Sequence, residues 1–69
     1  MKTVDARGLS CPQPVILATR EIITGEKEFE VLVDSEASYE NVTRILENKG
    51  FKFSTEEKED HQVIKALLI

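Results

Sequence analysis

Two prolines separated by a single residue, Pro12 and Pro14, limit what the amino-terminal part of this chain can form. A proline has a fixed φ and no amide hydrogen, so it disrupts the interior of a helix or the middle of a sheet. The first turn of a helix tolerates proline, because the amides there have no acceptor within the helix. Apolar residues follow at three- and four-residue spacing. We therefore expect a helix whose first residue is Pro12.

The period of this predicted helix assigns its two sides. The residues expected to face the core are Val15, Ala18, Thr19, Ile22 and Ile23. Arg20 and Glu21 fall on the opposite side, and Leu17 lies toward that polar side, where it is a candidate docking contact. Gly25 is the expected stop, because glycine commonly follows the last residue of a helix.

The rest of the chain supplies a second helix and four strands. A strand is expected over residues 2–6, and residues 28–34 alternate between apolar and polar side chains, as a half-buried strand does. Ser35 and Ser38 are candidate caps of a second helix that ends before Gly50. Strands over 51–55 and 61–69 then flank a charged turn at 56–60, with the single histidine, His61, read as a surface residue of a turn far from the cysteine.

This order, β-α-β-α-β-β, predicts an α/β two-layer sandwich. Right-handed crossovers place both helices on one face of a mixed four-stranded sheet. At 69 residues, the chain has the length of a single domain spanning residues 1–69. The opposite sheet face is expected to be more apolar than a solvated face, because Leu32, Val63, Leu67 and Ile69 are its candidate members.

Composition excludes several classes of function. Thirteen acidic residues against nine basic ones give a net charge of -4, which argues against direct binding of nucleic acid, since that affinity comes mostly from Lys and Arg. No apolar run is long enough to span a bilayer, and the amino terminus lacks the apolar stretch of a signal peptide. We expect a cytoplasmic protein with protein partners and no membrane association.

Cys11 is the only cysteine, so the chain forms no intramolecular disulfide, no Cys-rich zinc site and no dithiol redox pair. With Pro12 as the first helical residue, Cys11 would be the N-cap, and the Gln13 amide would point at its sulfur. The positive end of the helix dipole favours thiolate and lowers the pKa from about 8.5. Arg7, four residues earlier, is a candidate to add positive charge or to steer an anionic partner molecule, and the alternative is that it is simply a solvated surface residue. A reactive thiolate at Cys11 requires neither a metal nor a cofactor.

The stretch "DARGLSCPQPVILATR", residues 5–20, resembles the signature of the TusA/SirA/YedF family of small sulfur-carrier-like proteins. The shared element is Gly-Leu-x-Cys-Pro-x-Pro at residues 8–14. The resemblance implies the sandwich derived above and a persulfide carried on Cys11, with Pro12, Gln13 and Pro14 supporting the helix start. It also implies a cysteine desulfurase or another sulfurtransferase as donor, and an acceptor protein that the sequence does not name. Such a carrier is at most one component of a sulfurtransferase relay, which leaves open whether it is itself an enzyme.

An alternative of a different class remains open. The stretch "VDSEASYENV", residues 33–42, looks like the YedF-like branch, which has a link to selenium or sulfur metabolism. There the chain would be a non-catalytic interaction or regulatory module in which Cys11 only caps the first helix. A module of this kind tolerates Cys11→Ser, because serine is a favourable N-cap, whereas a sulfur carrier does not.

Overall fold

The computed structural model describes residues 2–10 and 12–68. The predicted element order, β-α-β-α-β-β, is confirmed. The elements are β1 (Lys2–Asp5), α1 (Gln13–Ile23), β2 (Glu28–Val33), α2 (Glu36–Asn48), β3 (Lys52–Glu57) and β4 (Gln62–Leu67).

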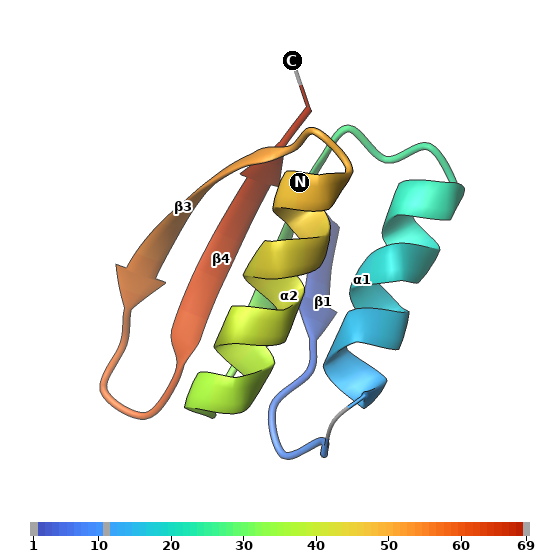
Figure 1. Cartoon of the computed structure of the whole chain (residues 1–69). Coiled ribbons are helices and arrows are strands. Elements are labelled where there is room, and N and C mark those ends of the chain that lie inside the picture. The colour runs from blue at the N-terminus through green and yellow to red at the C-terminus, as the bar shows by residue number, and fades with distance from the viewer. Residues whose placement is uncertain (1, 11, 69) are drawn as a thin grey trace.

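The four strands form one mixed sheet in the order β1-β2-β4-β3. β1 and β2 are parallel, whereas β4 is antiparallel to both of its neighbours, β2 and β3. β3 therefore runs parallel to β2 with β4 between them. Figure 1 shows α1 and α2 side by side on one face of this sheet. The predicted two-layer sandwich is thus confirmed.

The core lies between the sheet and the helices, and β2 supplies its centre. Phe29, Val31 and Val33 alternate along β2 as predicted, and all three are fully buried. The ring of Phe29 meets that of Phe51 edge to face, with centroids 5.6 Å apart. Strict alternation fixes the register, because a shift by one residue would turn this whole apolar set toward water.

The buried side of α1 agrees only in part with the one that its period predicted. Ala18 is buried, and Val15 and Ile22 pack against the core, as expected. Glu21 is also buried, however, and Ile23 is 78% exposed. Leu17 packs against the core instead of lying on the polar side. Apolar residues occur on both sides of this helix, so the period alone does not select the buried one. The Lys2 ammonium on β1 lies 3.2 Å from the Glu21 carboxylate and compensates its charge.

The third strand is longer than predicted. Residues 56 and 57 were expected in the charged turn, but Glu56 and Glu57 pair with Val63 and Gln62 and extend β3. The turn is restricted to residues 58–61, where the Lys58 amide donates to the carbonyl oxygen of His61 at 2.8 Å. Charged side chains are compatible with this strand end because β3 is an edge strand and all but Phe53 of its residues are exposed.

The sheet face away from the helices mixes apolar and charged residues. Leu32 pairs with Val63 there, so both point to this face, as expected. Val63 is nevertheless buried, so its neighbours on this face cover it. An ion pair at 3.2 Å between Lys65 and Glu56 crosses the same face, which is therefore less apolar than predicted. Ile69, the last predicted member, lies outside the described residues. Within the described part of the chain, no helix is long and apolar enough to cross a membrane.

Candidate functional site

One end of the sheet gathers segments that are far apart in the sequence. Since β1 and β2 are parallel, their carboxyl ends meet at the same edge, and the antiparallel β4 begins there. The loop after β1, the first turns of α1 and α2, and the β3–β4 turn all lie at the lower end of Figure 1. Cys11 lies outside the described residues, but its neighbours Ser10 and Pro12 are described. We call residues 6–12 the cysteine loop.

Three successive amides at the start of the cysteine loop have defined acceptors. The Ala6 amide donates to the Leu32 carbonyl at 2.9 Å, as a continuation of the sheet. The Arg7 amide donates to Oδ1 of Asp5 at 3.1 Å. The Gly8 amide donates to Oδ2 of Asp34 at 2.9 Å. Two side-chain carboxylates therefore fix the path that the chain takes as it leaves β1.

The helix after the loop begins one residue later than predicted. Pro12, expected as the first helical residue, is the N-cap, with φ -100° and ψ 19°. Its carbonyl accepts the first helical hydrogen bond, from the Ile16 amide at 3.0 Å. The Gln13 amide, expected to point at sulfur, instead donates to the Ser10 carbonyl at 2.9 Å. This turn makes Gln13 and Pro14 the first two helical residues, so the prediction of Cys11 as N-cap is wrong. Any contribution of these residues to sulfur chemistry remains a prediction.

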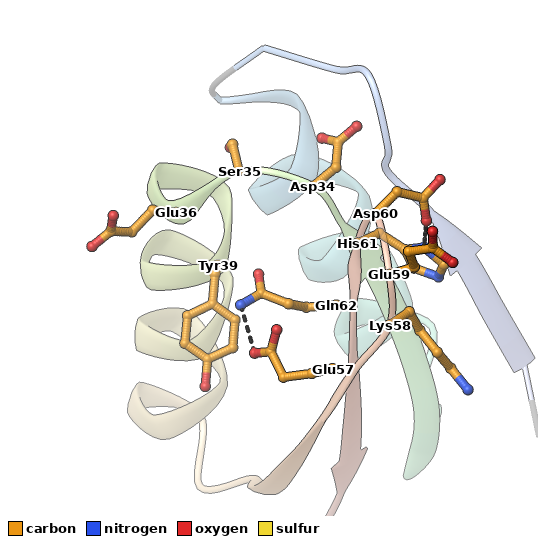
Figure 2. A pocket seen from close by; sticks show the side chains of 10 residues that line it. All are labelled: Asp34, Ser35, Glu36, Tyr39, Glu57, Lys58, Glu59, Asp60, His61 and Gln62. Atoms are coloured by element: carbon orange, nitrogen blue, oxygen red, sulfur yellow. Dashed lines mark hydrogen bonds and ion pairs between the residues drawn. The ribbon is translucent and has the colours of Figure 1, made fainter.

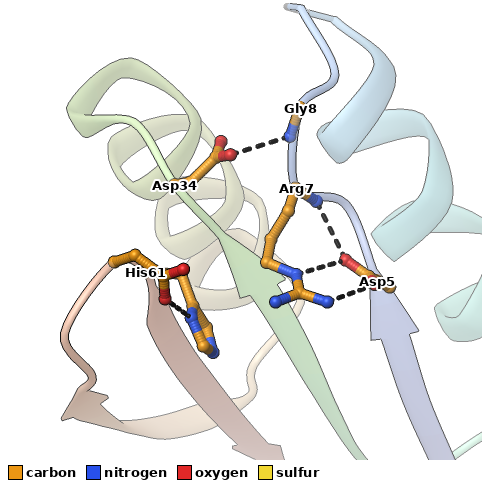
Figure 3. A network of polar contacts seen from close by, with 6 residues as sticks. Asp5, Arg7, Gly8, Asp34 and His61 are labelled. Carbon is orange, nitrogen blue, oxygen red and sulfur yellow. Dashed lines mark hydrogen bonds and ion pairs between the residues drawn. The ribbon is translucent and has the colours of Figure 1, made fainter.

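Arg7 forms a forked ion pair with Asp5 at the base of the loop (Figure 3). Its Nε donates to Oδ1 and its Nη2 to Oδ2, both at 2.9 Å. The hydrogen bonds from the Arg7 side chain, followed by that from its amide, lower the pKa of Asp5 to about 2. In turn, the Asp5 carboxylate raises the pKa of Arg7 above its ordinary value. The Asp5 carboxylate therefore bonds a loop amide as well as the guanidinium. Steering of an anionic donor by Arg7 remains a prediction.

The β3–β4 turn approaches the same region. Nδ1 of His61 lies 2.7 Å from Oδ1 of Asp60, and this contact lowers the pKa of Asp60. Asp5, Arg7, Asp34 and Asp60 line one shallow hollow of about 510 Å³. His61 does belong to the hairpin, but the expectation that this turn is far from the cysteine loop is wrong. The sequence carried no signal for this proximity, which follows from the antiparallel pairing of β4 with β2.

A second, larger hollow of about 560 Å³ lies between α2 and the same turn. Figure 2 shows that the side chains around it come from the start of α2 and from both arms of the hairpin. Its carboxylates are Asp34, Glu36, Glu57, Glu59 and Asp60. Within residues 2–10 and 12–68, no group of three or more His, Cys, Asp or Glu side chains is arranged to hold a metal ion. This side of the cysteine loop is therefore acidic, and its described residues form no metal centre.

The α1 side of the loop has the opposite character. Leu9 in the loop and Ile16 near the start of α1 are large apolar side chains that remain exposed there, and Ile23 is exposed at the far end of the helix. A groove of about 350 Å³ along α1 is lined by Val15, Ile16, Thr19, Arg20, Ile23 and Thr24. It contains one cationic side chain and no carboxylate. The candidate contact Leu17 is not part of this groove, because it packs toward the core. Sequence periodicity missed Ile16 and Ile23 as surface residues.

Together, this fold and this loop define a class of small two-layer α/β proteins whose sequence carries one cysteine just before the first helix. Residues 2–68 match the family described as sulfurtransferase TusA, so the chain belongs to that family. The resemblance expected from residues 5–20 is thereby confirmed. Membership gives the chain a general role as a sulfur carrier that works with other proteins.

The fold is also similar to the crystal structure of a SirA-like protein from Desulfitobacterium hafniense. The TM-score is 0.88 and the sequence identity is 32%, over 97% of this chain and 96% of that chain. Comparison with curated protein sequences gives no significant match.

Proposed function

We propose that Cys11 accepts one sulfane sulfur as a persulfide and passes it to an acceptor protein. The observation that carries this proposal is the match of residues 2–68 to a sulfurtransferase family in a chain with a single thiol. One thiol suffices for a carrier, because each transfer exchanges one persulfide for another.

The transfer needs no external oxidant, because each persulfide that forms replaces one that is consumed. The Cys11 thiolate attacks the outer sulfur of a donor persulfide, the S–S bond of the donor breaks, and the donor cysteine leaves as a thiolate. The acceptor thiolate then attacks the outer sulfur on Cys11, which leaves in the same way. Attack requires the thiolate form. The first turn of α1 contains no acidic residue, so the positive end of its dipole is not offset there and favours that form.

The donor would be a cysteine desulfurase or another sulfurtransferase. The exposed apolar residues Leu9 and Ile16 support contact with a protein on the α1 side of the loop. The net charge of -4 supports protein partners over nucleic acid. A cytoplasmic location fits this chemistry, since a reducing compartment keeps a lone thiol free. We also propose that residues 1–69 act as one domain.

Intact mass spectrometry tests the proposal directly. After incubation with a cysteine desulfurase and cysteine, the protein should gain the mass of one sulfur atom, and dithiothreitol should remove it. Cys11→Ser should abolish this gain while the far-UV circular dichroism spectrum stays that of the wild type. A folded Cys11→Ser variant that still supports sulfur flow in a reconstituted relay would contradict the carrier role and favour the interaction module.

A further inference from the structure

We propose that Asp34 is a positioning residue for sulfur transfer, because its carboxylate holds the cysteine loop through the Gly8 amide. This inference rests on the proposed function of Cys11. Gly8 precedes Cys11 by three residues, and Asp34 follows directly after β2. Figure 3 shows Asp34 reaching from the end of β2 across to Gly8. The hydrogen bond therefore joins two segments that are 26 residues apart.

Packing does not hold the loop at Gly8. A Cβ built at this position would find no atom within 4 Å, so the space around it is open. Its φ of +75° is a conformation that glycine adopts readily and that other residues rarely adopt. With few neighbours, the direction of the chain at this point depends on hydrogen bonds.

Asp34 is attached to rigid structure on both sides. Val33 before it is fully buried in the core. Ser35 after it is the N-cap of α2, and its Oγ accepts the Ser38 amide at 3.1 Å. The exposed Asp34 side chain thus projects from a fixed backbone. It transmits the position of β2 and α2 to the loop that carries the thiol.

The charge of Asp34 and its hydrogen bond have separable consequences. A carboxylate near a thiolate opposes its ionisation, since like charges disfavour each other. If charge were the contribution of Asp34, its removal would change sulfur transfer even with the hydrogen bond intact. If the hydrogen bond to Gly8 is what matters, a neutral side chain with an oxygen at the same position should serve. Asp34→Asn keeps that oxygen, whereas Asp34→Glu keeps the charge and displaces the oxygen by one methylene.

The test compares Asp34→Asn, Asp34→Glu and the matched control Asp60→Asn. Asp60 lines the same hollow as Asp34, but its side-chain hydrogen bond is with His61 and not with a loop amide. Two quantities are measured: the maximal rate at which a cysteine desulfurase loads Cys11, and the hydrogen exchange rate of the Gly8 amide by NMR. Asp34→Asn and Asp60→Asn should load within about twofold of the wild type. Asp34→Glu should load several-fold more slowly, and its Gly8 amide should exchange roughly tenfold faster.

Equal loading of all variants would overturn the proposal, and so would impaired loading of Asp34→Asn alone, which would assign the effect to charge. Because both Asp34 variants keep a polar side chain at an exposed site, they test position without removing a core contact. If the wild type is not loaded at all, the proposed function of Cys11 fails. Faster Gly8 exchange in Asp34→Glu would still establish the anchor in that case, and unchanged exchange would overturn it.

Discussion

At the scale of single residues, side-chain carboxylates accept hydrogen bonds from loop amides, as backbone carbonyls do within the helices and the sheet. Once the chain leaves β1, the Arg7 amide has no neighbouring strand to bond, and Asp5 accepts it. The same carboxylate receives the forked guanidinium of Arg7. Both side chains are about half exposed, so solvent screens their attraction and little stability follows from it. The measurable effect of this ion pair is the lowered pKa of Asp5.

Replacing Arg7 with glutamine should raise the pKa of Asp5 from about 2 toward its ordinary value of 3.8. The folded pKa of Asp5 is depressed, so its stabilising contribution is present above about pH 4 and is lost as the pH falls toward 2. Arg7→Gln should remove this part of the acid dependence. NMR titration of the carboxyl carbons measures the shift. Glu56, whose pKa is lowered by Lys58 and Lys65, should titrate unchanged. An unchanged Asp5 pKa in the variant would show that Arg7 does not cause the shift.

At the scale of elements, the two helices begin in different ways. α2 has a side-chain cap at Ser35 and an acidic residue, Glu36, in its first turn. α1 has no side-chain cap and no acidic residue there. The dipole of α2 is thus partly satisfied by its own sequence, whereas the start of α1 beside the cysteine loop is left positive. The two helix starts therefore differ in the charge that their own residues supply.

Ser35→Ala should lower the free energy of unfolding by about 1 kcal/mol, because the Ser38 amide loses its acceptor. Ser35→Asp should stay within a few tenths of a kcal/mol of the wild type, since aspartate is an equally good N-cap. Urea denaturation followed by circular dichroism measures both. Equal stability of the alanine and aspartate variants would show that the cap contributes nothing.

At the scale of the whole molecule, stability depends on a small hydrophobic core between one sheet and two helices. For a chain of 69 residues, the expected free energy of unfolding is roughly 3 to 10 kcal/mol. The largest fully buried side chains are Phe29, Leu46 and Ile64. They come from β2, α2 and β4, so removing one of them weakens contacts between the two layers. A cavity left by truncating one of these side chains therefore removes a large share of the free energy of unfolding.

Leu46→Ala should destabilise the protein by about 2–5 kcal/mol, the range for buried leucine, and partly unfold it at room temperature. Ile23→Ala is the control for the orientation of α1. Because Ile23 is 78% exposed, its truncation should change stability by less than about 0.5 kcal/mol. The midpoints of urea denaturation, compared at equal m-value, give the stabilities of the two variants. A cost for Ile23→Ala similar to that of Leu46→Ala would mean that α1 buries the side that its sequence period predicted.

The sequence by itself determined the order of elements and the inward set Phe29, Val31 and Val33. It also narrowed the cap of α2 to Ser35 or Ser38, of which Ser35 is the N-cap. These features depend on residues within a few positions of one another, where period and capping chemistry apply. The family resemblance likewise depended on one contiguous stretch, residues 5–20.

Only the tertiary structure decided that α1 buries Glu21 and exposes Ile23, and what surrounds the cysteine loop. Glu21 is buried because Lys2, on a different element, reaches its carboxylate. Asp34 meets Gly8 across 26 residues because parallel pairing brings the ends of β1 and β2 to the same edge. Which strands pair, and in which direction, decides such contacts, and this pairing belongs to the sheet as a whole rather than to one segment of the sequence.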